Sequence, residues 1–373
     1  MTRTNSGGAP ISGLRAAAYR IPTDAPEADG TFAWNSTTLI IVSVEAGGQS
    51  GIGYTYADAS IVPLVRGPLA EAIQDIDSFD IAGAWIAMQR RVRNLGRAGL
   101  AACAISAVDV ALWDAKARAL NLPLASLLGR CRDTIPIYGS GGFTTYSAEQ
   151  MRAQLSGWVE RDGCRYVKIK VGSEPERDPE RVTRAKSTIG DRELFVDANG
   201  AFSVKQAMIF LQQCADSDIR WFEEPVTSDD LHGLRIVRER TATATDVAAG
   251  EYIYTSDDAR RMLEAGAVDV LQADATRCGG ITGFLQVGAM CDAHHTDLSA
   301  HCAPALHRQV GCAVPRLRHI EWFHDHVRIE QMLFDGAPVP QDGAIEPDLG
   351  RAGLGLTLKS RDAERFQIGG ALQ

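Results

Sequence analysis

The chain has 373 residues, of which 45% are hydrophobic and 23% are charged, a composition typical of a folded globular protein. Its net charge of −9 comes without a long basic run, which argues against nucleic acid and against an anionic membrane surface as partners. The length exceeds what one compact core usually holds, so we expect one large domain and a smaller one.

The cysteines and the apolar segments indicate where the protein resides. None of the eight cysteines forms a CxxC pair, so a zinc site built from thiolates is not expected. The first ten residues are small and polar and lack the apolar core of a secretion signal, which predicts reduced thiols in a cytoplasmic protein. Residues 98–120 form the most apolar long stretch. They carry Asp109, Asp114 and Lys116, which indicates a buried helix and no membrane span.

Residues 1–130 have the pattern of an α+β domain. Residues 39–56 consist of two strand-like runs joined by a turn at Gly47 and Gly48, which predicts a β-hairpin. A helix over residues 99–120 is predicted to follow this hairpin.

From about residue 135 the chain repeats one unit, a short apolar strand that ends in a polar residue and is followed by a helix-like segment. Eight strands are predicted, at residues 134–142, 166–171, 193–199, 219–225, 246–252, 268–274, 296–301 and 319–323. Strands that alternate with helices form parallel sheets, and eight such units predict a closed (β/α)8 barrel of the TIM type. The alternative is an open doubly wound sheet. It normally has a glycine-rich phosphate turn after its first strand, and residues 139–143 match that turn too weakly.

These patterns divide the chain into three parts. Residues 1–130 are predicted to form an α+β capping domain, and residues 131–330 the α/β barrel. Residues 331–373 are rich in Gly and Pro and lack the rhythm of the barrel, so this C-terminal segment is predicted to return to the capping domain.

Two lysines share one face of the second predicted barrel strand. Lys168 and Lys170 are two residues apart, and side chains two apart on a strand point to the same side. Two ammonium groups repel each other if that side is dry, so the pair needs an explanation. One alternative is an edge strand with a solvated lysine face. The residues at the ends of the later strands favour a functional role instead.

Ionisable residues end the barrel strands one after another. In chain order they are Lys168, Lys170, Asp197, Glu223, Glu251, Asp274, His301 and Glu321. Because the carboxyl ends of barrel strands converge on one mouth, these side chains are expected to meet there. Three carboxylates on consecutive strands would repel without a counterion, and their oxygens suit Mg²⁺. Each acid could instead cap the following helix, but three in succession beside a lysine pair make that reading weaker.

The same set suggests acid–base chemistry. Each lysine, together with the metal, is expected to lower the pKa of the other, so that a lysine near neutral pH acts as a general base. Asp274 is expected to orient the imidazole of His301 and to raise its basicity. Glu321 could donate a hydrogen bond to developing negative charge if it is protonated. Arg277 follows Asp274 closely in the chain, and the sequence leaves open whether it forms an ion pair with the metal-binding acids.

The ordered motifs resemble the enolase superfamily, and in particular its mandelate racemase subgroup. The matching pieces are KIK, VDAN, FEEP, AGE, QADATRCGGITG, SAH and HIE, together with the helical segment at residues 105–129. The resemblance covers about residues 14–360. It implies an N-terminal α+β capping domain over a modified TIM barrel. It also implies Mg²⁺ on Asp197, Glu223 and Glu251, with Lys170 as base assisted by Lys168. His301 with Asp274 would act on the other face of the substrate, and Glu321 at the enolate oxygen.

The implied common step is removal of the proton α to a carboxylate of a small-molecule substrate, which gives an enediolate. We expect β-elimination of water from an acid sugar to follow, as in aldonate and aldarate dehydratases with 2-keto-3-deoxy acid products. The first alternative is a racemase, epimerase or cycloisomerase of the same subgroup. More remote alternatives are a barrel that binds a ligand without catalysis, and an aldolase that uses a lysine Schiff base.

Substrate specificity is expected in two segments of the capping domain, residues 21–34 and 53–60. Asn199, Ser140 and Tyr54 are the predicted substrate contacts, although Asn199 could equally be a turn residue. The two segments contain no lysine or histidine that could read a second carboxylate, which favours a monoacid unless Arg97 supplies the charge.

Three further expectations concern two histidines, one cysteine and the assembly of the protein. His324 and His326 could approach the barrel mouth, but a surface or structural role is favoured. Cys302 is expected to be a packed thiol. Relatives of the resembled family often assemble, so a homo-oligomer is expected.

Overall fold

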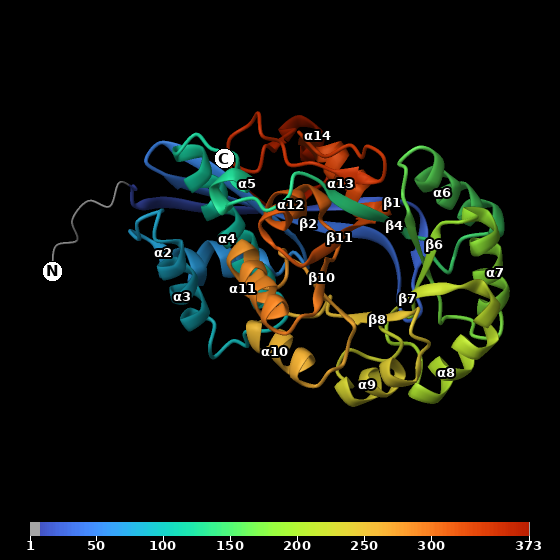
Figure 1. Ribbon diagram of the computed structural model, residues 1–373. Coiled ribbons are helices and arrows are strands. Elements are labelled where there is room, and N and C mark those ends of the chain that lie inside the picture. The colour runs from blue at the N-terminus through green and yellow to red at the C-terminus, as the bar shows by residue number, and fades with distance from the viewer. Residues whose placement is uncertain (1–7, 373) are drawn as a thin grey trace.

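The computed structural model describes residues 8–372 as an antiparallel sheet with helices packed beside a parallel barrel (Figure 1). The eight parallel strands and the N-terminal antiparallel sheet confirm the predicted fold class. The boundaries at residues 130 and 330 stay predictions.

The capping sheet has four antiparallel strands in the order β15-β1-β2-β3. Their bounds are β1 (Ile11–Ala28), β2 (Ala33–Ala46), β3 (Gln49–Tyr56) and β15 (Gln367–Ala371). Gly47 and Gly48 join β2 to β3 with φ of 58° and 78°, the conformation that a two-residue hairpin turn needs. β15 pairs with β1, so the end of the chain lies against its beginning.

The strand β1 was not predicted, because the sequence indicated strands before the barrel only within residues 39–56. Residues 21–34, where substrate specificity was expected, mostly belong to the β1–β2 hairpin, and only residues 29–32 form the turn. Residues 53–56 of the second such segment are the end of β3, as the predicted hairpin requires. The hairpin tip reaches the barrel in Figure 1. A Cβ at Gly30 would lie 2.5 Å from the carbonyl oxygens of Val171 and Ala198, so only glycine allows this approach.

Helices cover one side of the capping sheet. They are α1 (Ile61–Leu64), the π-helical turn η1 (Val65–Leu69), α2 (Ala70–Ile73), α3 (Ile81–Arg91), α4 (Leu100–Ala119) and α5 (Leu124–Leu128). The buried helix predicted over residues 99–120 is α4. β3 runs directly along it, because Cβ atoms at Gly51 and Gly53 would lie 2.3 and 2.1 Å from helix carbonyl oxygens. This close packing against α4 fixes the position of the residues that follow on β3, up to Tyr56.

The barrel closes because its last strand pairs with its first, so that β4 to β11 form one ring. The strands are β4 (Ile135–Gly141), β5 (Tyr166–Lys170), β6 (Glu193–Asp197), β7 (Ile219–Glu223), β8 (Asp246–Ala249), β9 (Val270–Ala273), β10 (Asp297–Ala300) and β11 (Leu317–Phe323). All eight predicted strands are present.

Helices separate successive barrel strands and pack around the ring. They are α6 (Ala148–Glu160), α7 (Asp178–Ile189), α8 (Val204–Gln213), the short η2 (Ala215–Ser217), α9 (Leu231–Arg240), α10 (Ser256–Glu264), α11 (Gly280–Ala293), α12 (Pro304–Val310) and the short η3 (Gly311–Ala313). Side-chain caps at Ser147, Ser203 and Thr255 start three of them.

After the barrel, α13 (His324–Leu333) begins at the end of β11 and leads into the C-terminal segment. That segment contains β12 (Phe334–Asp335), β13 (Ala344–Ile345), β14 (Thr357–Leu358) and α14 (Ser360–Glu364). β13 pairs antiparallel with β4 at the far end of the barrel. All eight cysteines are free thiols, as predicted, whereas the cytoplasmic location stays a prediction. Between residues 8 and 372, each helix is too short or too polar to cross a membrane.

α13 contacts the capping sheet through a buried glutamate. The carboxyl group of Glu330 accepts hydrogen bonds from the Tyr54 hydroxyl at 2.6 Å and from the Ala305 amide at 2.9 Å. Burial is the main reason that its pKa rises from 4.5 to about 8. The folded protein therefore keeps this proton at pH values where the unfolded chain has released it.

Replacing this glutamate should remove a pH dependence of stability. Between pH 4.5 and 8 the folded state binds more protons at Glu330 than the unfolded state, so this group lowers the free energy of unfolding as pH rises, by at most about 1.4 kcal/mol per pH unit. In Glu330→Gln, urea midpoints at pH 5.5 and 7.5 should differ less than in the unmodified protein. Glu346→Gln, at an exposed glutamate, is the control. An unchanged pH slope in Glu330→Gln would contradict the assignment.

Candidate active site

A pocket of about 420 Å³ lies where the carboxyl ends of the barrel strands face the capping sheet. The barrel contributes Lys170, Asn199, Glu251, Arg277, His301 and Glu321 to its lining. The capping sheet contributes residues from the β1–β2 turn, β2 and the end of β3. The predicted convergence of the ionisable strand ends therefore occurs.

Three carboxylates form the metal-binding candidate. Asp197 and Glu223 are the last residues of β6 and β7 and lie opposite each other in the parallel register, and Glu251 follows β8. One oxygen from each lies within 4.8 Å of the others, and all three side chains are buried. A compact, oxygen-only donor set of this kind fits Mg²⁺.

The pKa values of Glu223 and Asp197 indicate repulsion between the carboxylates of this cluster. Burial, followed by repulsion from Asp197, raises the pKa of Glu223 to about 8. Burial also acts to raise the pKa of Asp197, but the nearby Lys170 and Lys168 outweigh it and lower that pKa. Both ammonium groups contact Asp197, whereas Glu223 contacts Lys168 and is still repelled by Asp197 and Glu321, so a cation would relieve the repulsion within the cluster.

The two lysines occupy different depths. Lys170 lines the pocket, and its Nζ lies 2.6 Å from Asp197 Oδ2. Lys168 lies below it with no exposed surface, and its Nζ is 2.6 Å from Glu223 Oε1 and 2.8 Å from Glu321 Oε1.

The side chains around each lysine give it a net raised pKa, whereas the predicted lowering included a bound metal. Burial lowers the pKa of Lys170, and Lys168 lowers it further, but attraction to Asp197 outweighs both and the pKa is raised. Glu223 and Glu321 have the same effect on Lys168 against its burial. Sequence spacing revealed the neighbouring lysine but not how close the carboxylates come.

His301 and Asp274 form the predicted pair. His301 Nδ1 lies 2.9 Å from Asp274 Oδ2, and this contact turns Nε2 toward Glu251 at 3.4 Å and Glu321 at 3.7 Å. Arg277 connects Glu251 to Asp274. Its Nη1 donates to the Glu251 carbonyl at 3.1 Å and lies 3.5 Å from Glu251 Oε1, and its Nε lies 3.8 Å from Asp274. The open question about Arg277 is thus answered in favour of the ion pair.

The predicted hydrogen bond from Glu321 required a protonated carboxyl group. Burial would raise its pKa, but Lys168, and then His301, hold that pKa well below its ordinary value. The carboxylate accepts hydrogen bonds from the Ser140 hydroxyl at 2.5 Å and the Cys302 amide at 3.2 Å. An ionised Glu321 cannot donate the predicted hydrogen bond.

Of the three predicted substrate contacts, only Asn199 lines the pocket. Its Oδ1 is buried without a hydrogen-bond partner among residues 8–372, and its φ of 46° also fits the turn role. Ser140 is fully buried and its hydroxyl donates to Glu321. Tyr54 is fully buried against α13, where it donates to Glu330, so the structure does not bring it to the pocket.

The sequence reading gave too little weight to residues that the fold brings to this pocket. Tyr56 and His326 both line it, and their rings stack with centroids 3.4 Å apart. Cys302, expected to be a packed thiol, is buried but also lines it, with Sγ 3.3 Å from His301 Nε2. His324 lies outside the lining and pairs with Asp24 at 3.0 Å. Alternation along β3 placed Tyr54 and Tyr56 on one face but could not say which lay over the barrel mouth.

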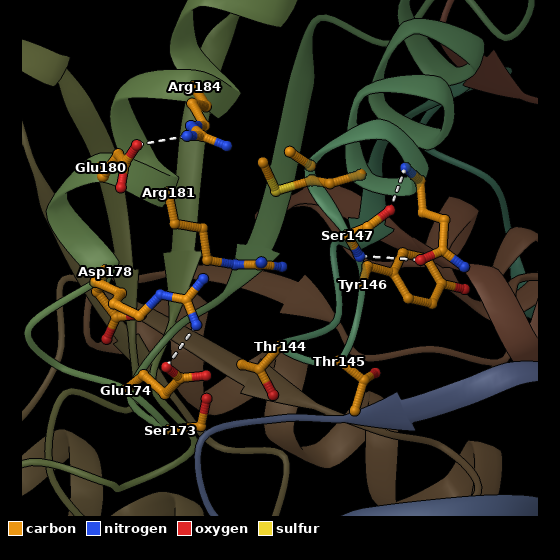
Figure 2. Close-up of a pocket in the computed structure, with 14 residues that line it drawn as sticks. Thr144, Thr145, Tyr146, Ser147, Ser173, Glu174, Asp178, Glu180, Arg181 and Arg184 are labelled. Carbon is orange, nitrogen blue, oxygen red and sulfur yellow. Dashed lines mark hydrogen bonds and ion pairs between the residues drawn. The ribbon is translucent and has the colours of Figure 1, made fainter.

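A larger pocket of about 620 Å³ lies on the outside of the barrel between α6 and α7 (Figure 2). Its arginines have partners: Arg177 pairs with Glu174, Arg184 with Glu180, and Arg181 donates to the carbonyls of Gly142 and Phe143. It contains none of the residues at the strand ends. The smaller pocket at the barrel mouth therefore remains the candidate active site.

Comparison with known families matches nearly the whole chain. Residues 20–129 match the family model described as "Mandelate racemase / muconate lactonizing enzyme, N-terminal domain", and residues 150–363 match "Enolase C-terminal domain-like".

Two curated relatives are acid-sugar enzymes. The chain is 32% identical to the 3,6-anhydro-alpha-L-galactonate cycloisomerase of Streptomyces coelicolor, over 96% of this chain and 100% of that protein. It is 31% identical to the L-talarate/galactarate dehydratase of Salmonella typhimurium, over 88% of this chain and 82% of that protein.

Two solved structures have the same fold. A mandelate racemase/muconate lactonizing enzyme-like protein from Rubrobacter xylanophilus is 48% identical with a TM-score of 0.94, over 96% of this chain and all of that one. A racemase from Streptomyces coelicolor with bound magnesium is 29% identical with a TM-score of 0.90, over 96% of this chain and all of that one.

Removing one carboxylate charge should weaken Mg²⁺ binding. Glu223→Gln keeps the shape of the side chain but loses an anionic ligand, so the dissociation constant for Mg²⁺ measured by titration calorimetry should rise at least about tenfold. Glu193→Gln is the matched control, because Glu193 begins β6 at the opposite end of the barrel and pairs with Arg165. Unaltered Mg²⁺ affinity in Glu223→Gln would remove this residue from the ligand set.

Proposed function

Because the chain belongs to the mandelate racemase/muconate lactonizing enzyme family of the enolase superfamily, we propose that it is a Mg²⁺-dependent dehydratase of an acid sugar. The substrate loses its proton at C2 and its hydroxyl at C3, and the product is a 2-keto-3-deoxy acid. The observation that carries the proposal is that Lys170 and His301, two groups able to move protons, line one pocket beside the three-carboxylate cluster.

Asp197, Glu223 and Glu251 would hold the cation. Bound Mg²⁺ would supply positive charge that stabilises the second negative charge on a deprotonated substrate carboxylate and that competes with Lys170 for Asp197. The fit rests on the oxygen-only donor set and on the repulsion that raises the pKa of Glu223.

Lys170 is the proposed base for the C2 proton. Its Nζ is the lysine nitrogen that faces the pocket, whereas Lys168 is enclosed below it. Lys170 takes the proton in its neutral form, and the electron pair of the C–H bond moves into the carboxylate to give the enediolate. Lys168 bonds to Glu223 and Glu321, so its role is to position these carboxylates and to balance their charge.

His301 is the proposed acid. Asp274 accepts the hydrogen on Nδ1, which orients the ring and leaves Nε2 facing the pocket. As the enediolate collapses, the C3–O bond breaks, and the departing hydroxyl takes the Nε2 proton and leaves as water. The resulting enol then tautomerises to the 2-keto acid, so no further reactant is needed.

A cycloisomerase is the second candidate. The relative with that activity is 32% identical and aligns with 96% of this chain and with its own full length. The same proton transfers would serve, with an internal oxygen as leaving group or nucleophile in place of free water.

A racemase or epimerase would use Lys170 and His301 on opposite faces. Binding without catalysis and Schiff-base chemistry remain alternatives, and the cytoplasmic, homo-oligomeric state remains a prediction.

A proton NMR screen in D₂O with Mg²⁺ should identify the reaction. With a panel of aldonic and aldaric acids, we expect one member to lose its C2 proton signal and to give the C3 methylene signals of a 3-deoxy-2-keto acid. Loss of the C2 signal with an epimer as product would overturn dehydration in favour of the racemase alternative. A product isomeric with its substrate and lacking a keto-acid methylene would favour the cycloisomerase.

The two proton carriers should be separable by substitution. Lys170→Ala should reduce C2 exchange of the identified substrate at least about 1,000-fold, because the general base is lost, while Mg²⁺ binding persists. His301→Asn should permit C2 exchange but reduce elimination, because the acid for the leaving hydroxyl is lost. Isotope exchange by NMR and product formation are measured in parallel. If Lys170→Ala exchanges at the rate of the unmodified protein, the base is another residue.

A further inference from the structure

A buried hydroxyl without a partner marks the end of the pocket that lies against the capping sheet. Tyr56 is the last residue of β3, is 9% exposed and lines the pocket. Its Oη is buried and has no hydrogen-bond partner within residues 8–372. A buried hydroxyl left in this way costs free energy, so a bound molecule that accepts its hydrogen would remove a penalty.

His326 holds the tyrosine ring in place. The two rings stack with centroids 3.4 Å apart at an interplanar angle of 14°, and Phe323 contacts the imidazole edge-on. The Ala303 amide donates to His326 Nδ1 at 3.4 Å, which puts the imidazole hydrogen on Nε2. Burial is the main cause that lowers the pKa of His326 to about 3, and interactions with His301 and Arg277 act in the same direction. The pair therefore offers two neutral donors.

The charges of the pocket are divided between its floor and its rim. Among the lining residues the permanent cations are Lys170 and Arg277, and both contact floor carboxylates, Asp197 and Glu251. The rim carries Asp29 and Asp58. A second carboxylate at the far end of a substrate would meet these two anions without a free cation. Arg97 is exposed between α3 and α4, and neither it nor Arg20, whose charge reaches Asp58, lines the pocket.

Hydroxyl groups complete the same end of the pocket. Ser36 and Thr38 stand two residues apart on β2 and both line it, close to the aromatic side chains of Phe32 and Trp34. Hydroxyls and neutral donors exchange hydrogen bonds with sugar hydroxyls, and acidic oxygens such as those of Asp58 accept them.

We propose that Tyr56 and His326 bind a hydroxyl at the far end of the substrate, and that the pocket therefore selects monocarboxylic (aldonic) over dicarboxylic (aldaric) sugar acids. This inference rests on the proposed acid-sugar chemistry and assigns its substrate class. A dicarboxylic acid of the same stereochemistry differs only at the terminal carbon, where it places a charge against Asp29 and Asp58.

The direct test compares matched pairs of acids. Each hexonate is assayed beside the hexarate of the same configuration, for example gluconate with glucarate and galactonate with galactarate, with Mg²⁺ present. Loss of the C2 proton and formation of keto acid are followed, and Mg²⁺-dependent thermal stabilisation is recorded for every compound. In the reactive pair, kcat/KM should be at least about 100-fold higher for the monoacid.

Substitution of the tyrosine tests the proposed contact. Tyr56→Phe removes only the hydroxyl, so KM for the preferred monoacid should rise about tenfold while kcat changes less than about twofold. Tyr54→Phe is the matched control: it loses a hydroxyl two residues earlier on β3 that binds Glu330, so its melting temperature should fall while KM stays unchanged. If Tyr56→Phe does not fold, His326→Gln is measured in its place.

The outcomes separate this inference from the proposed function. If a diacid reacts as well as its monoacid partner, or if Tyr56→Phe leaves KM unaltered, the inference is wrong although the dehydratase proposal stands. If no compound loses its C2 proton, the dehydratase proposal fails. The inference is then decided by binding alone, and it is overturned unless monoacids stabilise the protein more than their diacid partners do.

Discussion

The structure of the barrel mouth depends on the balance between buried ammonium and carboxylate groups. Asp197 and Glu223 have no exposed surface, and the equally buried ammonium group of Lys168 lies within 3.4 Å of both and also of Glu321. Burying such groups costs several kcal/mol for each ion, which their mutual attraction repays only with close geometry. Apolar side chains would pack the barrel at lower cost. The chain retains these charges where parallel strands end, the position in a barrel at which chemistry is done.

Hydrogen bonds from the capping sheet and its helices hold the capping domain against the barrel, where it forms one wall of the pocket. The Thr55 hydroxyl donates to the Thr276 carbonyl at 2.7 Å, and Trp85 Nε1 donates to the Gly279 carbonyl at 2.8 Å. Asp109, buried on α4, accepts from the amide and hydroxyl of Thr282 at the start of α11. These bonds all reach the β9–α11 segment, which also carries Asp274 and Arg277. The pocket residues of the capping sheet are thereby held in register with the proposed catalytic residues of the barrel.

Much of this arrangement could be predicted from sequence, because the signals are local and repeated. Each barrel strand is a short apolar run, and its last polar residue is known once the run is found, so Asp197, Glu223 and His301 were placed correctly at strand ends. The match to both family domains also confirms the resemblance drawn from those motifs. The β1–β2 hairpin was missed because Pro22, Asp24 and Pro26 weaken the strand pattern. In the folded chain the pairing with β2 runs to Pro22 and resumes at Glu27.

Other errors came from distances that no local pattern contains. The ionised state of Glu321 follows from a lysine more than 150 residues away in the chain, and the raised pKa of Lys170 follows from the closeness of Asp197. Tyr54 and Tyr56 lie on the same face of β3, about 7 Å apart along the strand. That distance puts one hydroxyl under α13 and the other over the barrel mouth.

The cations of the pocket lie at its floor because the buried carboxylates there need them. The floor must balance three carboxylates, so its cations, Lys170 and Arg277, are already paired and cannot also serve a distant part of the substrate. The wall formed by the capping domain and α13 is free of that demand, and it presents hydroxyls, aromatic rings and the neutral imidazole of His326, with Asp29 and Asp58 at the rim. A fold that places its proton-transfer and metal-binding groups at barrel strand ends, and its other pocket residues on separate elements, can change substrate through those elements while the barrel chemistry is preserved.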